Sequence, residues 1–276
     1  MRRATFALGL LGLLGIAPCA RAGGDCSRLA PWNRVGVSLG HYVEPVPLVL
    51  TGLSPVPLLI FAPTGLDHDL RLVAQEDLGG KYKLEPVSIW TPYVLAGSFA
   101  IGWGVSAVVG ACEIQRPLSA MLQAMGGGLI VTGLLKWSVG RTWPNGGQDP
   151  HAPDRLSHPE YAQQFQPFGP HFGAWPSGHT LAMMAAASAF RASEYELGWV
   201  RFAGYPFAAA VAVGLWLGDR HWASDILSGA MLGEAIGSSV GKSFARAEDT
   251  PVGLEHGAPY LAPVAGGALV GWAAEW

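Results

Sequence analysis

The sequence predicts an all-α protein, a bundle of about six helices embedded in a membrane. Half of the residues are apolar and only 13% are charged, whereas an ordinary soluble domain carries roughly 25% charged residues. Several long stretches are almost free of charge, and the alternation expected of strands is scarce. The formal net charge of −3 gives no reason to expect a nucleic-acid partner.

The first residues have the pattern of a secretory signal. Two arginines follow the first methionine, an apolar run covers residues 4–17, and Ala20-Arg21-Ala22 matches a cleavage site. We therefore expect residues 1–22 to be a signal peptide, with an uncleaved anchor as the alternative. Export would bring Cys26 and Cys112 into an oxidising compartment, where one disulfide is an option, although the sequence favours two buried thiols.

Residues 23–90 are predicted to form an exported N-terminal segment. Its apolar stretch, residues 46–62, is interrupted by Pro47, Pro55 and Pro57. A proline inside a helix removes a hydrogen bond and clashes with the preceding turn. The stretch is therefore predicted to be a poor membrane span.

Residues 91–246 are predicted to form the helical bundle itself, followed by an apolar tail over residues 247–276. Its expected helices are the uncharged segments 91–112, 117–135, 180–190, 202–218 and 226–241. In the last of them glycines recur at every fourth position, a spacing that lets two helices pack backbone to backbone. These glycines are Gly229, Gly233, Gly237 and Gly241.

The distribution of basic residues predicts an orientation. If residues 46–62 do not cross, Lys136, His179 and His221 share the exported side. The cytoplasmic side then receives Arg116, Arg191, Arg201, Lys242 and Arg246, as the positive-inside rule prefers. We expect a bacterial-type inner-membrane protein whose site faces the periplasm, with a soluble periplasmic protein as the alternative.

Pro176-Ser177-Gly178-His179 opens an apolar helical segment. The start of a helix offers unpaired N–H groups and the positive end of its dipole, which together favour an anion such as phosphate. Ser177 suits the N-cap position, and Gly178 permits a ligand to approach the backbone. This segment is therefore a candidate phosphate-binding site.

His221 and Asp225 lie one helical turn apart, so they share a face. A carboxylate in that position can fix the tautomer of the imidazole. A histidine that acts as a nucleophile needs this arrangement, because its other nitrogen must remain unprotonated.

With Lys136, these motifs resemble the type 2 phosphatidic acid phosphatase and vanadium haloperoxidase superfamily, over roughly residues 118–241. The resemblance implies that His221 attacks phosphorus to form a phosphohistidine, which Asp225 supports by orienting the ring. His179 would protonate the leaving oxygen and then activate water. Lys136 and the amides of Ser177 and Gly178 would hold the phosphoryl oxygens, with no metal or other cofactor.

The chain departs from the family pattern at two arginines. Trp143 and Leu215 stand where the family motifs have arginine. Arg141 is the favoured replacement as a phosphate ligand, Arg220 is second, and Arg155 is a weaker candidate. Trp143 itself is expected to anchor the chain at the membrane interface, with a wall against a lipid chain as the other option.

The expected function is hydrolysis of a phosphate monoester or diphosphate, most of all of a lipid. Phosphatidate, phosphatidylglycerol phosphate, undecaprenyl diphosphate and lipid A all remain open as substrates. One alternative is a soluble periplasmic acid phosphatase. Another is a catalytically weakened family member that acts as a binding or structural protein of the membrane. Vanadate-dependent halogenation ranks last, because it too depends on the absent guanidinium groups.

Overall fold

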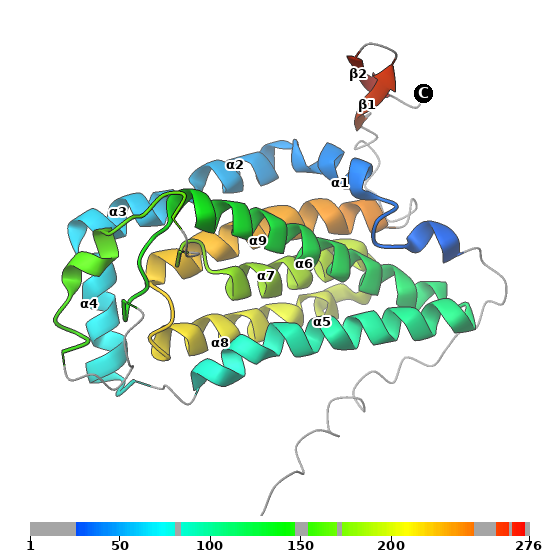
Figure 1. Ribbon diagram of the computed structural model, residues 1–276. Helices are drawn as coiled ribbons and strands as arrows, with labels where there is room; N and C mark the ends of the chain where they lie inside the picture. Colours follow the sequence, from blue (N-terminus) through cyan, green and yellow to red (C-terminus); the bar gives the residue numbers. More distant parts are fainter. Residues whose placement is uncertain are drawn as a thin grey trace, which may run out of the picture.

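A computed structural model describes residues 26–80, 84–146, 154–169 and 173–245, and the backbone of 258–264 and 267–273. The expected signal peptide lies outside these residues, as does Arg246. The elements before the bundle are η1 (Cys26–Leu29), α1 (Val35–Tyr42), α2 (Pro45–Leu53), α3 (Val56–Thr64), α4 (Leu66–Leu72) and the π-helical turn η2 (Val73–Asp77). The remaining helices are α5 (Leu84–Val109), α6 (Cys112–Val139), η3 (Pro159–Gln163), α7 (Gly178–Ser193), η4 (Tyr195–Phe202), α8 (Gly204–Leu217) and α9 (Ala223–Phe244) (Figure 1).

The all-α bundle is confirmed, and the five helices expected within it are all present, as α5 to α9. Their ends differ from the expected bounds by a few residues, mostly because polar residues extend the helices beyond their uncharged parts. Within residues 247–276, the structure adds a short antiparallel hairpin of β1 (Ala258–Val264) and β2 (Gly267–Ala273), in which Val264 pairs with Gly267.

The prediction that the proline-rich stretch is a poor span is wrong. Residues Pro45–Thr64 form α2 and α3, and together they are long and apolar enough to cross a membrane. Pro45 and Pro47 lie in the first turn of α2, and Pro57 lies in the first turn of α3. A proline costs little there, because the first N–H groups of a helix have no intrahelical acceptor.

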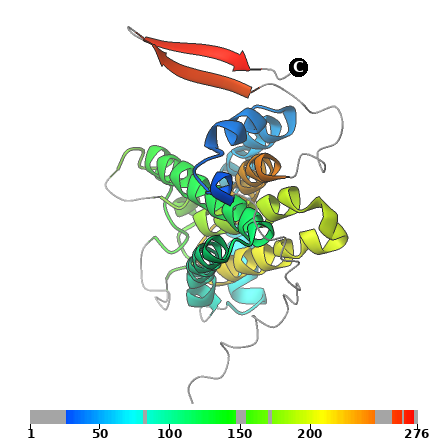
Figure 2. The same ribbon diagram turned by 90° about the vertical axis from the view of Figure 1, so that its right-hand side faces the viewer.

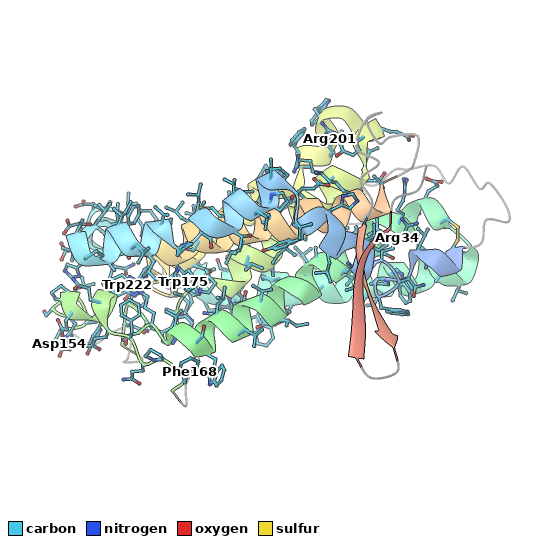
Figure 3. The ribbon with its side chains drawn as sticks, turned by 90° about the horizontal axis from the view of Figure 1, so that it is seen from above. Arg34, Asp154, Phe168, Trp175, Arg201 and Trp222 are labelled. Carbon is cyan, nitrogen blue, oxygen red and sulfur yellow. A yellow bond between two sulfur atoms is a disulfide. The ribbon has the colours of Figure 1, made fainter. Side chains whose placement is uncertain are left out.

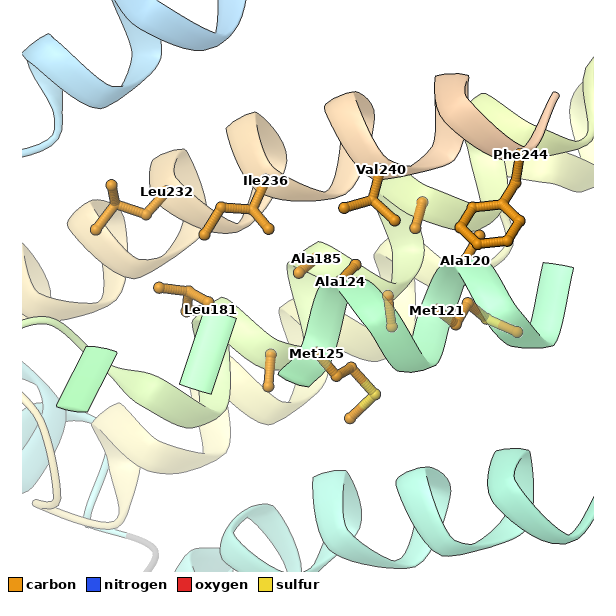
Figure 4. Packing of buried hydrophobic residues seen from close by; sticks show 13 residues of the cluster. Ala120, Met121, Ala124, Met125, Leu181, Ala185, Leu232, Ile236, Val240 and Phe244 are labelled. Atoms are coloured by element: carbon orange, nitrogen blue, oxygen red, sulfur yellow. The ribbon is translucent and has the colours of Figure 1, made fainter. Parts of the chain in front are cut away.

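Helices α6, α7 and α9 enclose the main core. Its buried side chains include Met121 and Met125 from α6, Leu181 from α7, and Ile236 and Phe244 from α9 (Figure 4). The predicted packing role of the glycine row is confirmed, since an added Cβ at each of its four positions would collide with a backbone oxygen of α7 or of its N-cap residue. Those oxygens belong to Ser177, Leu181, Ala185 and Ala189.

The bundle has two ends that differ in content (Figure 1). The α4 end holds α4, the C-terminal end of α6 and the first turns of α7 and α9. The Arg34 end holds α1 and the last turn of α9, where Arg34 donates to the carbonyl oxygen of Ser243 at 2.5 Å. Trp175 and Trp222 lie toward the first end, away from Arg34 and Arg201 (Figure 3). A view along the bundle shows how closely the long helices are grouped (Figure 2).

A disulfide joins Cys26 to Cys112 at the Arg34 end, with 5.3 Å between the two Cα atoms. The expectation of two buried thiols is therefore wrong. Sequence spacing could not reveal the pair, because η1 folds back onto α6 and brings together cysteines that are 86 positions apart.

Among the residues that the structure describes, four helical segments are long and apolar enough to cross a membrane: Pro45–Thr64, Leu84–Val109, Cys112–Val139 and Tyr195–Leu217. Only 11% of the most apolar window of α5 is buried inside the protein, and the windows of the others are at most one third buried. Large apolar side chains such as Val108 and Ile130 are exposed there. Contiguous apolar surface of this extent fits a lipid-facing wall and disfavours a soluble bundle.

Candidate active site

The spacing of His221 and Asp225 predicted a shared helix face. His221 instead precedes α9, whose N-cap residue is Trp222, and its side chain meets that of Asp225 in the first turn. His221 Nδ1 lies 3.3 Å from Asp225 Oδ2, and both side chains are buried. Asp225 Oδ2 also accepts the backbone N–H of Trp222 at 3.1 Å, which fixes the carboxylate at the head of the helix. With Nδ1–H donating to Asp225, the lone pair of His221 is on Nε2.

The other carboxylate oxygen of Asp225 belongs to Arg141. Arg141 Nη1 donates to Asp225 Oδ1 at 2.5 Å and to Ser224 Oγ at 2.8 Å. Its Nη2 donates to Asp67 Oδ2 at 2.6 Å, while Nε and Nη2 both donate to the carbonyl oxygen of Ala162. These bonds use all five N–H groups of the guanidinium. The geometry therefore does not support the phosphate-binding role expected for Arg141.

Arg220 immediately precedes His221 in the chain. It is partly exposed, and its buried Nε has no hydrogen-bond partner among the described residues. Its guanidinium carbon stands 4.5 Å from the centre of the Trp143 ring, and its Nη1 lies 3.8 Å from Glu85 Oε1. Of the two candidate replacements, Arg220 is the one with a donor left for a ligand.

Trp143 is part of the site, and the expectation that it anchors the chain at the membrane interface is not supported. Its ring centre is 4.9 Å from that of His221 and 4.7 Å from Nζ of Lys136, with Arg220 against it as well. Lys136 also donates to the carbonyl oxygens of Gly173 and Ala174, each at 2.8 Å. The indole thus replaces the family arginine with a surface that two cations can contact.

His179 projects from the first turn of α7, and its buried Nε2 has no hydrogen-bond partner among the described residues. Its ring packs edge-on against Tyr93, with 5.7 Å between the ring centres. Ser177 is the N-cap residue, but its N–H donates to the carbonyl oxygen of Asp225 at 2.9 Å. Of the two amides expected to hold phosphate, that of Gly178, at the first helical position, is the better placed.

The electrostatics favour neutral imidazoles in the free protein. Burial lowers the pKa of His221 to about 3, with a further contribution from Lys136 and against the opposing effect of Asp225. Burial and then the charges of Lys136 and Arg220 lower the pKa of His179 to about 4. Burial by itself would raise the pKa of Asp225, but Arg141 and His221 outweigh it and hold that pKa below its ordinary value.

Sequence reasoning missed α4. Asp67 accepts from Arg141 and from Ser224, and Arg71 forms a bidentate pair with Asp219, both bonds at 2.7 Å. A signal was present, because residues 65–71 concentrate charged side chains directly after an apolar stretch in a chain with few charges. The boundary expected at residue 90 had separated this segment from the bundle, whereas α1 to α4 pack on α9.

Arg155, the weaker candidate, does not reach the histidines. Its Nη1 lies 3.2 Å from Asp219 Oδ2 and 3.3 Å from Gln75 Oε1, beside the pair that Asp219 makes with Arg71. It belongs to the supporting contacts behind the site.

Comparison with known proteins agrees with this arrangement. Residues 117–247 match the model of the PAP2 superfamily. The chain is also 25% identical over 248 residues to a protein of Porphyromonas gingivalis named lipid A 1-phosphatase, an alignment that covers 86% of this chain and 50% of the relative. The chain thus spans about half the length of that relative. No solved structure matches.

Proposed function

The chain belongs to the PAP2 superfamily, and on that premise we propose that it is a membrane phosphatase that removes phosphate from a lipid. The observation that carries the proposal is the grouping of His221, Lys136 and Arg220 around Trp143, with Asp225 directly behind His221. His179 is close enough for the charges of Lys136 and Arg220 to act on its imidazole. Two histidines and two cations at one place suit phosphoryl transfer, in which charge accumulates on the oxygens around phosphorus.

In the proposed first step, Nε2 of His221 attacks phosphorus and the bond to the leaving oxygen breaks. The oxygen takes a proton from His179, whose pKa rises when a phosphate anion binds beside it and offsets Lys136 and Arg220. Asp225 accepts the Nδ1–H of His221 and balances the positive charge that the ring gains. In the second step His179 takes a proton from water, which attacks the phosphohistidine and releases phosphate. These steps need no metal or organic cofactor.

We propose lipid A as the first substrate to test, because the relative is named for removing its 1-phosphate. Purified protein should release phosphate from lipid A in mixed micelles with a higher kcat/KM than from p-nitrophenyl phosphate. Phosphatidate, phosphatidylglycerol phosphate and undecaprenyl diphosphate, tested under the same conditions, would identify another lipid class. Absence of release from every lipid would contradict the proposal.

Arg220 is the proposed anchor for the phosphate. Arg220→Ala should lower kcat/KM at least tenfold, roughly 1.4 kcal/mol, and should raise the inhibition constant of inorganic phosphate, because a charge-assisted donor is lost. Arg201→Ala is the matched control, since Arg201 packs on Tyr195 and Phe202 away from the site. Equal inhibition constants for the two variants would contradict the role.

We propose that the Arg34 end faces the periplasm, because the disulfide between Cys26 and Cys112 lies there and disulfides do not persist in the cytoplasm. The crossing of Pro45–Thr64 then places the α4 end on the cytoplasmic side. This proposal reverses the orientation expected from the sequence, which rested on the assumption that residues 46–62 do not cross. A periplasmic reporter should therefore be inactive when fused after Lys136 and active when fused after Ala245. The opposite pattern would contradict the orientation.

A further inference from the structure

Asp67 is a fully buried carboxylate that lies outside the part of the chain matched by the family. Its Oδ1 accepts the backbone N–H of Ser224 at 3.0 Å, and its Oδ2 accepts from Ser224 Oγ at 2.5 Å and from Arg141 at 2.6 Å. Ser224 precedes Asp225 in the first turn of α9. Asp67 therefore caps the helix that carries Asp225, the carboxylate that orients His221. It also pairs with Arg141, which in turn pairs with Asp225.

The three charges Asp67, Arg141 and Asp225 form a continuous buried row. Arg141 lies between the two carboxylates, with 2.6 Å to Asp67 and 2.5 Å to Asp225, and none of the three side chains is exposed. Two negative charges and one positive charge leave a net charge of −1 behind His221. Arg141 and Asp225 alone would be neutral.

That remaining charge matches the one His221 acquires. When the imidazole takes a phosphoryl group while Nδ1 keeps its proton, the ring becomes positive, and a buried site stabilises it only through nearby negative charge. Lys136 and His179 act on the same ring and add no negative charge. Beside the phosphoryl oxygens themselves, the protein's share of the compensation comes from the row that ends at Asp225.

Resting on the function proposed above, we infer that Asp67 is a positioning residue for the reaction. It neutralises Arg141, so that the carboxylate of Asp225 remains available to His221, and it holds the first turn of α9 in place.

The second contact of α4 supports this inference independently. One turn after Asp67, Arg71 holds Asp219 through two hydrogen bonds of 2.7 Å, two residues before His221. The ring of Trp222 lies against both guanidinium groups, 5.6 Å from that of Arg71 and 5.3 Å from that of Arg141. Helix α4 thus contacts the chain on both sides of His221, at Asp219 before it and at Ser224 after it.

Asp67→Asn tests the charge with little change of shape, and Asp69→Asn, on an exposed position of the same helix, is the control. We expect Asp67→Asn to lower kcat at least tenfold, while the inhibition constant of inorganic phosphate, set by Lys136 and Arg220, changes less than threefold. The double variant Asp67→Asn/Arg141→Gln restores the net charge of −1 and removes both partners of a buried pair together. The kcat of the double variant should be at least threefold higher than that of Asp67→Asn.

Each outcome decides the inference. An active wild type with Asp67→Asn equal to Asp69→Asn would overturn the positioning role alone, and an inactive wild type would overturn the proposed function and the role with it. If Asp67→Asn lowers kcat and weakens inhibition by phosphate to the same extent, and the double variant does not recover, Asp67 is a purely structural residue and the inference is overturned. If Asp67→Asn does not fold, the double variant decides: kcat within about tenfold of wild type supports the role, and a larger loss overturns it.

Discussion

His221→Ala should abolish phosphate release, with a fall in kcat of at least about a thousandfold, roughly 4 kcal/mol in activation free energy. The reason is that Nε2 of His221 is the atom proposed to form the bond to phosphorus, and no other imidazole is backed by Asp225. His158→Ala is the control, because His158 stacks on Tyr161 in the loop. His221→Gln fills more of the buried space and separates lost chemistry from a lost side chain.

The same experiment reveals the intermediate. Phosphohistidine survives alkali and is destroyed by acid, so an alkaline quench with labelled lipid should leave label on the wild type and none on His221→Ala. Label that persists on His221→Ala would contradict the assignment of the nucleophile.

Asp225→Asn should produce the second largest loss, at least about a hundredfold in kcat, roughly 2.7 kcal/mol. An amide can present its N–H to Nδ1 of His221 and select the wrong tautomer. Stability should also fall, because Arg141 loses one of its two carboxylates. Since Asp67 remains paired with Arg141, the loss should stay below the about 3–5 kcal/mol typical of a fully broken buried pair.

Kinetics and denaturant unfolding measured on one preparation would check both parts. The control is Asp154→Asn, an exposed carboxylate on the loop whose Oδ2 lies 3.8 Å from Nε2 of His158. Full activity in Asp225→Asn would show that His221 does not depend on this carboxylate.

The parts of the fold that follow from local patterns could be predicted from the sequence. The five helices of the bundle and the glycine packing of α9 depend on spacing within one helix. His221 and Asp225 are close in sequence and do meet, although His221 precedes the helix that carries Asp225. Trp143, Arg141 and Arg220 are close to the motifs in sequence, yet their roles depend on the direction in which each side chain leaves the backbone. Arg141 points into the protein toward Asp67, whereas the side chain of Arg220 stays partly exposed.

Contacts between distant segments cannot be predicted from local patterns. The prolines of residues 46–62 predict helix interruptions, although in the structure they begin helices. The disulfide and the role of α4 depend on how the N-terminal segment packs against the bundle. Asp67 lies 74 positions from Arg141 and 157 from Ser224. No pattern in a single sequence indicates that a carboxylate so far away completes the surroundings of His221.

Because Asp67 and Arg71 of α4 contact residues beside His221, the site depends on a segment that lies outside residues 117–247. Residues 117–247 would not make a self-sufficient enzyme if expressed alone, since excision would leave Arg141 and Ser224 without Asp67, and Asp219 without Arg71. Natural variation should obey the same constraint. Where relatives lose the acid that corresponds to Asp67, the guanidinium that corresponds to Arg141 should change with it.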